Sequence, residues 1–440
     1  MTSRSNTPAP LAATYQERVL WQTQADPPTL EPHALPAEVD VAVIGAGYCG
    51  LAAGRELARA GRSVLVIDRD PIGTGASTRN GGMVIPELKA GPVALEKKYG
   101  PTGRRLYDQV NEAFDHVETL IADEQIECDY SRSGQLYLAH NHDHVAGLQA
   151  MAAEHGGELG EPVHWVPRDE LGDEIGSSSF YGGVVIERTG GLHPARFHAG
   201  LAELAVVAGA DLHDRTTAIS LARRSGPAGG FDLTTNRGSV VARHALVATN
   251  AYADGLVPWL RRRVVPVGSY IIATEVLDPE VARSVSPRNR MLVDTKNFLF
   301  YWRLSPDGRV LFGGRRSLAP ASIPEARDFL YSAMVRLHPQ LRGTRLEHAW
   351  GGNVAVTLDR MPHFGQIPSG AAAGAWFATG CNGSGVALNT WLGAQAAAVI
   401  DGAPPPAFAD ISFPAVPAHA LRAAYLPVVG QWFGYQDRRP

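Results

Sequence analysis

A strand, a glycine-rich turn and a helix follow one another in residues 39–60, and this unit constrains the fold more than any other feature. The apolar run at 39–44 ends at Gly45, and a helical pattern begins directly after the turn. Gly45 permits a tight turn, Gly47 lets the backbone approach a pyrophosphate, and Gly50 lets the helix pack close to the sheet. The free N–H groups at the start of the helix would then face the phosphates.

A second strand, residues 63–67, ends at Asp68 and Arg69, about 20 residues after the turn, where a carboxylate binds ribose hydroxyls. An isolated G-x-G-x-x-G is weak evidence. The combination of strand, turn, helix and acid is specific, and it predicts a Rossmann-type dinucleotide-binding unit.

Two further glycine-rich stretches are typical of segments that lie against a ligand. Residues 72–82 contain four glycines among small polar residues and no core pattern, so their backbone can lie against a flat molecule. Near the other end of the chain, the strand at 376–379 meets the turn Gly-Cys-Asn-Gly-Ser-Gly at 380–385 and a helix over 387–400. This second helix N-terminus is predicted to serve the same cofactor.

Because Rossmann-type strands occur both early and late, the cofactor domain must be discontinuous. The segments at 264–275 and 291–314 alternate between apolar and polar residues and are typical of strands, and 323–337 is helical in pattern. We therefore expect an α/β fold, with a largely antiparallel β-sheet substrate domain inserted into a Rossmann-type domain. The predicted division is an N-terminal surface arm at 1–36, a cofactor domain at 37–90, 183–257 and 345–402, a substrate domain at 91–182 and 258–344, and a C-terminal extension at 403–440.

Composition excludes several other classes. The 440 residues carry a net charge of −4, which argues against a nucleic-acid partner. The three cysteines have no C-x-x-C spacing, so neither a disulfide framework nor a zinc site is indicated. The stretch His140-Asn-His142-Asp-His144 is more typical of a solvated turn than of a metal site, and we predict no metal. No apolar stretch has transmembrane length and no signal peptide is apparent, so a cytoplasmic protein without a membrane span is expected.

Several blocks together resemble the D-amino-acid oxidase (DAO) family of FAD-dependent oxidoreductases. They are the glycine turn with Asp68, the loop 75–82, Leu-His-Pro-Ala-Arg at 192–196, Ala-Thr-Asn-Ala-Tyr at 248–252 and the turn 380–385. The Arg-Asn-Gly-Gly loop and the hairpin at 300–314 resemble the γ-glutamylputrescine oxidoreductase branch. The resemblance implies oxidation of a C–N bond of an amine or amino acid to an imine, which hydrolyses, while O2 or another acceptor reoxidises the flavin.

The resemblance also implies how the cofactor is held. Some family members attach flavin through a cysteine near the segment that here is 350–354, and this chain has no cysteine there, so non-covalent FAD is expected. The candidate cofactor-binding residues are Gly45, Gly47, Tyr48, Cys49, Gly50, Asp68, Arg69, Gly75, Ala76, Ser77, Arg79, Asn80, Gly81, Gly82, Ala218, Thr249, Asn250, Gly352, Gly380, Asn382, Gly383, Ser384, Gly385 and Val386.

The sequence contains no second dinucleotide turn for a nicotinamide and no redox disulfide pattern, so the reductant is expected to be the organic substrate itself. Two alternatives stay open. One is a flavin-dependent dehydrogenase of a non-amine substrate, and the other is a flavin-binding protein without amine turnover.

Candidate substrate residues come from strand alternation at 297–304. Tyr301 and Arg303 share one face, where they would hold a substrate carboxylate or else form a structural ion-pair network. His193 precedes a helix start, and it is at least as typical of a structural histidine as of a catalytic one. Lys296 and His363 are further candidates near the flavin, with a turn or structural role as the alternative. The predicted substrate is a small-molecule amine bearing a remote or α-carboxylate.

Overall fold

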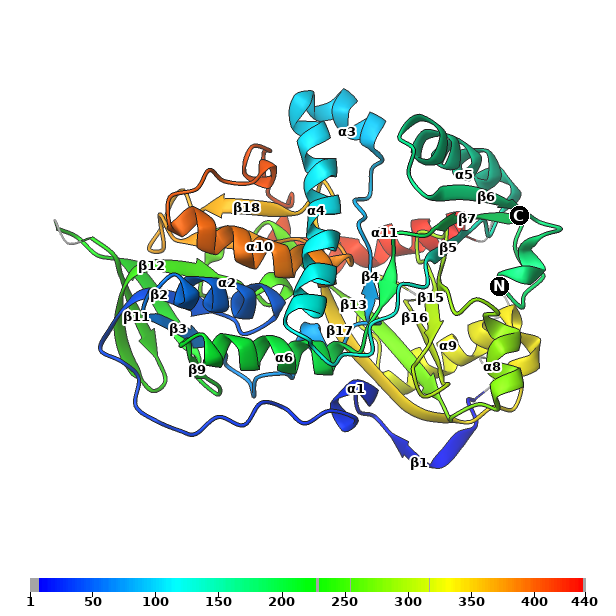
Figure 1. Ribbon diagram of the computed structural model, residues 1–440, viewed down its shortest axis with the longest axis horizontal. Helices are drawn as coiled ribbons and strands as arrows, with labels where there is room; N and C mark the ends of the chain where they lie inside the picture. The colour runs from blue at the N-terminus through cyan, green and yellow to red at the C-terminus, as the bar shows by residue number, and fades with distance from the viewer. Residues whose placement is uncertain (1–7, 227–228, 254, 316, 438–440) are drawn as a thin grey trace.

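The protein, seen here in a computed structural model, consists of two β-sheets with helices packed against them (Figure 1). The structure describes residues 8–226, 229–253, 255–315 and 317–437, so the first seven residues of the predicted arm and the last three of the predicted C-terminal extension lie outside it. The helices are α1 (Leu20–Thr23), α2 (Tyr48–Arg59), α3 (Pro92–Tyr99), α4 (Pro101–Asp123), α5 (Val145–Ala152), α6 (Pro194–Val207), α7 (Pro258–Arg261), α8 (Pro279–Val285), α9 (Ile323–Leu337), α10 (Gly385–Ile400) and α11 (Arg422–Gln436). Within the described ranges, no helix combines the length and the apolar character needed to cross a bilayer.

The first sheet contains the predicted Rossmann unit. Its strand order in the described residues is β10-β11-β12-β2-β3-β9, with β19 beside β12 and β18 beside β19. The strands are β2 (Glu38–Ile44), β3 (Val64–Ile67), β9 (Asp211–His213), β10 (Ala218–Arg223), β11 (Phe231–Thr235), β12 (Gly238–Val247), β18 (His363–Gln366) and β19 (Trp376–Thr379). Strands β12, β2, β3 and β9 run parallel, and residues 41–44 are all buried, as a parallel sheet covered on both faces requires.

The second sheet is largely antiparallel. Its order is β1-β17-β13-β16-β15-β14-β5-β7-β6, with parallel pairs only at β1–β17 and β5–β14 among the described strands. The strands are β1 (Leu11–Gln16), β5 (Gln135–Leu138), β6 (Val163–Pro167), β7 (Gly182–Ile186), β13 (Val264–Thr274), β14 (Met291–Asp294), β15 (Tyr301–Leu304), β16 (Val310–Gly314) and β17 (Leu346–Thr357). A short pair, β4 (Met83–Val84) and β8 (Gly190–Gly191), lies apart from both sheets.

Each sheet has its own apolar core, and the predicted α/β fold class is confirmed. Helices α2, α4, α6 and α10 contribute to the core cluster that includes Val41 and Val66 of the first sheet, and Figure 1 shows these helices gathered over it. Helix α9 packs on the second sheet and begins with a capping box formed by Ser322 and Glu325.

Sheet membership differs from the predicted domain division at two strands. Strand β7 pairs with β5 and β6, and β17 pairs with β13 along its whole length, so both belong to the second sheet. Both strands fall in the predicted cofactor-domain segments 183–257 and 345–402. Strand β7 is a nearly continuous apolar run, and such a run does not reveal which sheet it joins.

The N-terminal arm is more than a surface segment. Strand β1 pairs in parallel with β17, and Leu20 and Trp21 of α1 are buried with 1% and 0% of their surface exposed. The Trp21 indole N–H donates to the carbonyl of Asn80 at 2.9 Å. The arm therefore fastens the loop 72–82 to the second sheet, which the sequence did not indicate.

Candidate active site

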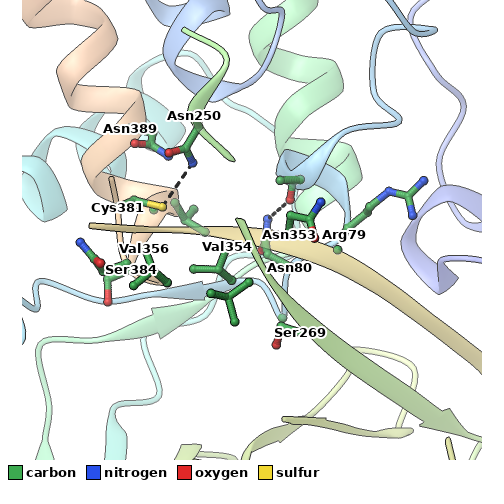
Figure 2. A pocket seen from close by; sticks show the side chains of 18 of the residues that line it. Arg79, Asn80, Asn250, Ser269, Asn353, Val354, Val356, Cys381, Ser384 and Asn389 are labelled. Carbon is green, nitrogen blue, oxygen red and sulfur yellow. Dashed lines mark hydrogen bonds between the residues drawn. The ribbon is translucent and has the colours of Figure 1, made fainter. Parts of the chain in front are cut away.

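A cavity of about 2120 Å3 lies between the two sheets, and residues from both line it. The first sheet contributes the turn after β2 and the end of β3, and the second contributes β13, β15 and β17. Figure 2 shows the part where Val354 of β17 lies between Asn250 and Cys381 on one side and Arg79 and Asn80 on the other, with Val356 beside Ser384.

The turn after β2 is built so that only glycine fits at two positions. Gly45 has φ of 109°, and a Cβ there would lie 2.9 Å from the carbonyl oxygen of Ala248. A Cβ on Gly50 would lie 1.8 Å from the carbonyl oxygen of Gly45. The turn therefore leaves a shallow cradle at the N-terminus of α2, which suits a pyrophosphate.

Gly47 has a different reason to be glycine. Its φ of −82° and ψ of −173° are extended and open to any residue, so a side chain there would cause no backbone strain. A Cβ would instead lie 2.9 Å from Oγ of Ser77, which accepts a 3.0 Å hydrogen bond from the backbone N–H of Tyr48. Space, rather than conformation, requires glycine at this position.

Asp68 stands at the end of β3, where the sequence placed a ribose-binding acid. Its carboxylate accepts hydrogen bonds from the N–H groups of Ala46 at 2.9 Å and Asp70 at 3.1 Å. Burial raises the pKa of Asp68, although these two N–H groups oppose the shift. The carboxylate ties β3 to the glycine turn and still lines the cavity.

The loop 72–82 is held by its backbone and by neighbouring segments. The Arg79 guanidinium donates to the carbonyls of Thr74 at 2.8 Å and Gly351 at 3.1 Å, and the Trp350 indole donates to the carbonyl of Arg79 at 2.9 Å. These bonds fasten the loop to β17, so Gly73, Gly75 and Gly81 face the cavity in a fixed arrangement.

The second glycine turn precedes α10, as expected. Asn250, with φ of 44°, accepts from the N–H of Gly380 at 3.1 Å and donates to Sγ of Cys381 at 3.4 Å, the contact drawn in Figure 2. Asn382 accepts from the N–H of Thr357 at 3.1 Å. These amides join the ends of β12 and β19 to β17 and place a second helix N-terminus at the cavity.

The structure brings nearly all of the predicted cofactor-binding residues to one cavity. Gly50, Gly82 and Gly380 are the exceptions, because each supports a turn from behind the lining. The residues that line the cavity are Gly45, Gly47, Tyr48, Cys49, Asp68, Arg69, Gly75, Ala76, Ser77, Arg79, Asn80, Gly81, Ala218, Thr249, Asn250, Gly352, Asn382, Gly383, Ser384, Gly385 and Val386.

Of the predicted substrate pair, Tyr301 lines the cavity and Arg303 does not. The Tyr301 hydroxyl lies 3.1 Å from Oγ of Ser269, and burial raises the pKa of Tyr301 while this hydrogen bond opposes the shift. The Arg303 guanidinium is 3% exposed and donates to the carbonyls of Gly82 at 3.2 Å and Leu192 at 3.0 Å. Arg303 thus holds the end of the loop 72–82 outside the cavity lining, even though it shares a strand face with Tyr301.

His193 and His363 also lie outside the lining, whereas Lys296 is part of it. His193 caps α6, since its Nδ1 accepts from the N–H of Arg196 at 3.2 Å, and burial lowers the pKa of His193 to about 4. His363 contacts the carboxylate of Asp359 at 3.1 Å. Lys296 donates to the buried Asp294 at 2.9 Å, so its charge is already paired.

Sequence reasoning missed Arg315, which follows β16 and lines the cavity beside Tyr301. Burial lowers the pKa of Arg315, and the neighbouring charge of Arg360 adds to the shift. Within the part of the chain that the structure describes, no hydrogen bond or ion pair is formed by Arg315. Its position directly after the Gly313-Gly314 end of the hairpin was the available signal, because a strand end delivers its next side chain to the sheet edge.

The histidine-rich stretch at 140–144 is not the group of residues best suited to bind a metal ion. His140 and His144 both contact Oγ1 of Thr295, at 3.1 and 2.7 Å. Among the described residues, the histidine and acid group that fits a metal ion is His33, Asp211 and His213, where the arm meets β9.

A Rossmann-type turn, an acid at the end of β3 and a second helix N-terminus around one cavity define a dinucleotide-dependent oxidoreductase with two sheets. The chain belongs to the DAO family, described as FAD dependent oxidoreductase, whose sequence model matches residues 40–399. It is 30% identical over 404 residues to γ-glutamylputrescine oxidoreductase of Escherichia coli, covering 91% of this chain and 93% of the relative. It is 32% identical to the probable oxidoreductase OrdL of Haemophilus influenzae, covering 82% and 83%.

Solved structures share the fold. Glycine oxidase from Geobacillus kaustophilus superposes with a TM-score of 0.74 at 21% identity, covering 87% of this chain and 99% of that one. L-proline dehydrogenase from P. horikoshii gives 0.68 at 19% identity, covering 84% and 96%. The two-sheet architecture is therefore shared with these solved structures.

Proposed function

We propose that the protein oxidises the C–N bond of an amine that carries a carboxylate, and that Arg315 holds the carboxylate. The observation that supports this most is the unpaired guanidinium of Arg315 in the cavity, beside Tyr301. An Arg fork in a desolvated site binds a planar carboxylate through two parallel hydrogen bonds. The names of similar proteins, which include γ-glutamylputrescine oxidoreductase and glycine oxidase, support an amine or amino acid as the substrate.

The glycine cradle, Asp68 and the turn before α10 are the residues that would hold FAD, which when bound supplies hydride acceptance. The chain's own groups bind and orient the substrate. Tyr301 stays neutral because burial raises its pKa, so it offers a hydroxyl near the carboxylate. Leu426 and Phe433 on α11 line the same cavity and exclude water from it.

The test is an anaerobic screen of amines and amino acids with the holoenzyme, following bleaching of the oxidised flavin band. We expect a carboxylated amine to bleach the flavin faster than its matched amine without the carboxylate. Arg315→Ala should weaken binding of the acidic substrate roughly 30-fold to several thousand-fold, the equivalent of about 2–5 kcal/mol. Arg315→Lys should recover part of the loss, since it restores the charge without the fork.

Arg342→Ala is the matched control, because Arg342 is exposed and lies outside the cavity lining. It should leave bleaching unchanged. Preference of the wild type for the neutral amine would remove the carboxylate from the proposal. Bleaching by a non-amine alone would favour a dehydrogenase of another substrate class, and no bleaching at all would favour a flavin-binding role.

We also propose that the FAD is non-covalent and that the reaction takes place in the cytoplasm, with O2 or another oxidant as acceptor. Acid precipitation should release the chromophore into the supernatant as FAD. Colour that stays in the pellet would show a covalent link, and oxygen consumption during turnover would distinguish the two kinds of acceptor.

A further inference from the structure

The N-terminal arm meets the edge of the first sheet through two histidines and an acid. The segment between α1 and β2 forms no helix or strand, and Figure 1 shows it running past β9, the edge strand of that sheet among the described residues. Its His33 lies beside Asp211 and His213, which are two residues apart on β9 and therefore share one face of the strand. We call these three residues the arm cluster.

The arm cluster brings one ligand atom from each side chain into a small volume. Oδ1 of Asp211 lies 2.7 Å from Nε2 of His33 and 3.0 Å from Nε2 of His213, and all three atoms are within 4.8 Å of one another. In a tetrahedral zinc site with bonds of about 2.0–2.1 Å, the ligand atoms lie roughly 3.3 Å apart. The side chain of His33 is 52% exposed and free to move outward, so a small movement opens the cluster enough for an ion.

The surroundings of His33 favour a positive ion at its Nε2. Its Nδ1 lies 2.8 Å from the carbonyl oxygen of Glu31, which can only accept, so Nδ1 carries a proton. A neutral imidazole has one proton, and Nε2 then presents its lone pair to the carboxylate oxygen of Asp211 only 2.7 Å away. Either a second proton or a metal ion must lie between these two atoms. A backbone carbonyl on the other ring nitrogen is also a usual partner of a metal-binding histidine.

His213 contributes a buried ring nitrogen that forms no hydrogen bond. The residue is 2% exposed, and among the described residues its Nε2 has no hydrogen-bond partner, although Oδ1 of Asp211 is 3.0 Å away. The ring of His213 also lies against that of His33, with 4.2 Å between the centroids. An ion held by Asp211 and His33 would therefore lie inside the cluster, among its own ligands, and would meet this nitrogen without needing a separate cavity.

Arg237 is the group that opposes an ion at His213. It donates to Nδ1 of His213 at 3.3 Å, which leaves the imidazole proton on Nε2. Its two other contacts, to Oγ1 of Thr216 at 3.2 Å and to the carbonyl of His33 at 2.6 Å, do not depend on this one. When an ion binds, the proton moves to Nδ1 and the longest of the three contacts is lost. The other two keep Arg237 in place, and it still holds the backbone of His33 near β9.

We propose that the arm cluster binds a divalent transition-metal ion, Zn2+, which fastens the segment between α1 and β2 to β9. Two imidazole nitrogens, a carboxylate oxygen and a water on the solvent side make a four-coordinate site of the kind that zinc prefers, and zinc has no redox chemistry of its own. The backbone carbonyl of His213 accepts from the N–H of Asp68 at 2.9 Å, so the fastening lies next to the acid at the end of β3. No sequence pattern indicates the site, because 178 residues separate His33 from Asp211.

The experiment measures zinc binding to the tag-free holoenzyme after treatment with a chelator and dialysis. Titration calorimetry with zinc chloride at neutral pH gives the stoichiometry and the affinity. The variants are His33→Gln and Asp211→Asn, which change one ligand each and keep the size of the side chain. His142→Gln is the matched control, because His142 is exposed in the histidine-rich stretch 140–144 and is not part of the arm cluster. Hydrogen–deuterium exchange of the backbone amides at 26–36 tests whether zinc fastens the segment.

We expect the wild type and His142→Gln to bind one zinc ion per chain. His33→Gln and Asp211→Asn should bind it at least roughly tenfold more weakly, since losing a ligand costs no less than losing one of its outer partners. Zinc should slow exchange at 26–36 in the wild type and leave it unchanged in His33→Gln, while equal flavin content shows that the variants are folded. Absence of stoichiometric zinc in the wild type would mean that a second proton joins His33 to Asp211. That result, zinc binding that survives both variants, or exchange that zinc does not slow in the wild type would each overturn the proposal.

Discussion

The two ends of the cavity are formed by different parts of the polypeptide, mainly backbone at one end and side chains at the other. The cofactor cradle consists mainly of backbone, shaped by glycines such as Gly45 and held by local hydrogen bonds. The substrate end consists of side chains, including Ser269, Tyr301 and Arg315, which are brought together by the order of strands β13, β15 and β16 in the second sheet. A turn is specified by neighbouring residues, whereas a side-chain site depends on how whole strands are ordered. The first therefore leaves a sequence pattern and the second does not.

The most severe way to break the cradle is Gly47→Val. The added Cβ and its methyl groups would displace Ser77 Oγ, only 2.9 Å from the Cβ position, and fill the space intended for the pyrophosphate. We expect purified protein with almost no flavin, read from the ratio of the 450 nm and 280 nm absorbance, and a circular dichroism spectrum that still shows a folded chain. Gly172→Val, at an exposed position with open space around its Cβ, should keep its flavin. Full flavin occupancy in Gly47→Val would show that the phosphates lie elsewhere.

A smaller effect is expected at His198, which is hydrogen-bonded to the backbone of the glycine turn after β2. Its Nε2–H donates to the carbonyl of Ala46 at 2.8 Å, and burial lowers the pKa of His198 to about 4. Because the unfolded chain takes up this proton near pH 6.5, stability is complete above that pH and is lost as pH falls toward 4. The loss from this group is about 3 kcal/mol.

His198→Gln keeps an amide donor and cannot titrate. Urea unfolding between pH 7 and 4 should therefore show a shallower decline in the free energy of unfolding for the variant than for the wild type. Identical slopes would mean that His198 is already protonated in the folded protein or is not buried.

Arg303→Lys tests the difference between Arg303, which holds the carbonyls of Gly82 and Leu192, and Arg315, which lines the cavity. Lysine cannot hold the carbonyls of Gly82 and Leu192 with a planar fork, so we expect about 1–3 kcal/mol less stability. Thermal unfolding measures this loss, and the KM for a carboxylated amine should change far less than in Arg315→Ala. A large rise in KM with unchanged stability would return Arg303 to the substrate site.

The smallest effect is expected for Tyr301→Phe, which removes only the hydroxyl hydrogen-bonded to Ser269. A neutral hydrogen bond contributes about 1 kcal/mol, so kcat/KM should fall roughly fivefold with the flavin retained. A loss of a thousandfold or more would mean that the hydroxyl takes part in proton transfer.

The sequence predicted the parts of the protein that depend on local order. The unit from β2 to Asp68, the helix at 323–337 and the turn before α10 could all be predicted, because their signals lie within a few residues. Arg303 shows the limit. Alternation placed it on the face of Tyr301, but the carbonyls of Gly82 and Leu192, from segments more than 100 residues away, occupy its donors. Arg315 could not be singled out for the converse reason, since its lack of a partner is a property of the folded surroundings.

Because β1 pairs with β17, it cannot join its sheet during synthesis until β17 has been made. Leu11 is made more than 300 residues before its partner Leu346. At about 5–20 residues per second, the N-terminal strand waits roughly 20–70 s for its neighbour. During that interval Trp21 also lacks the second sheet to pack against, so the arm can dock and fasten the loop 72–82 only after β17 has been made.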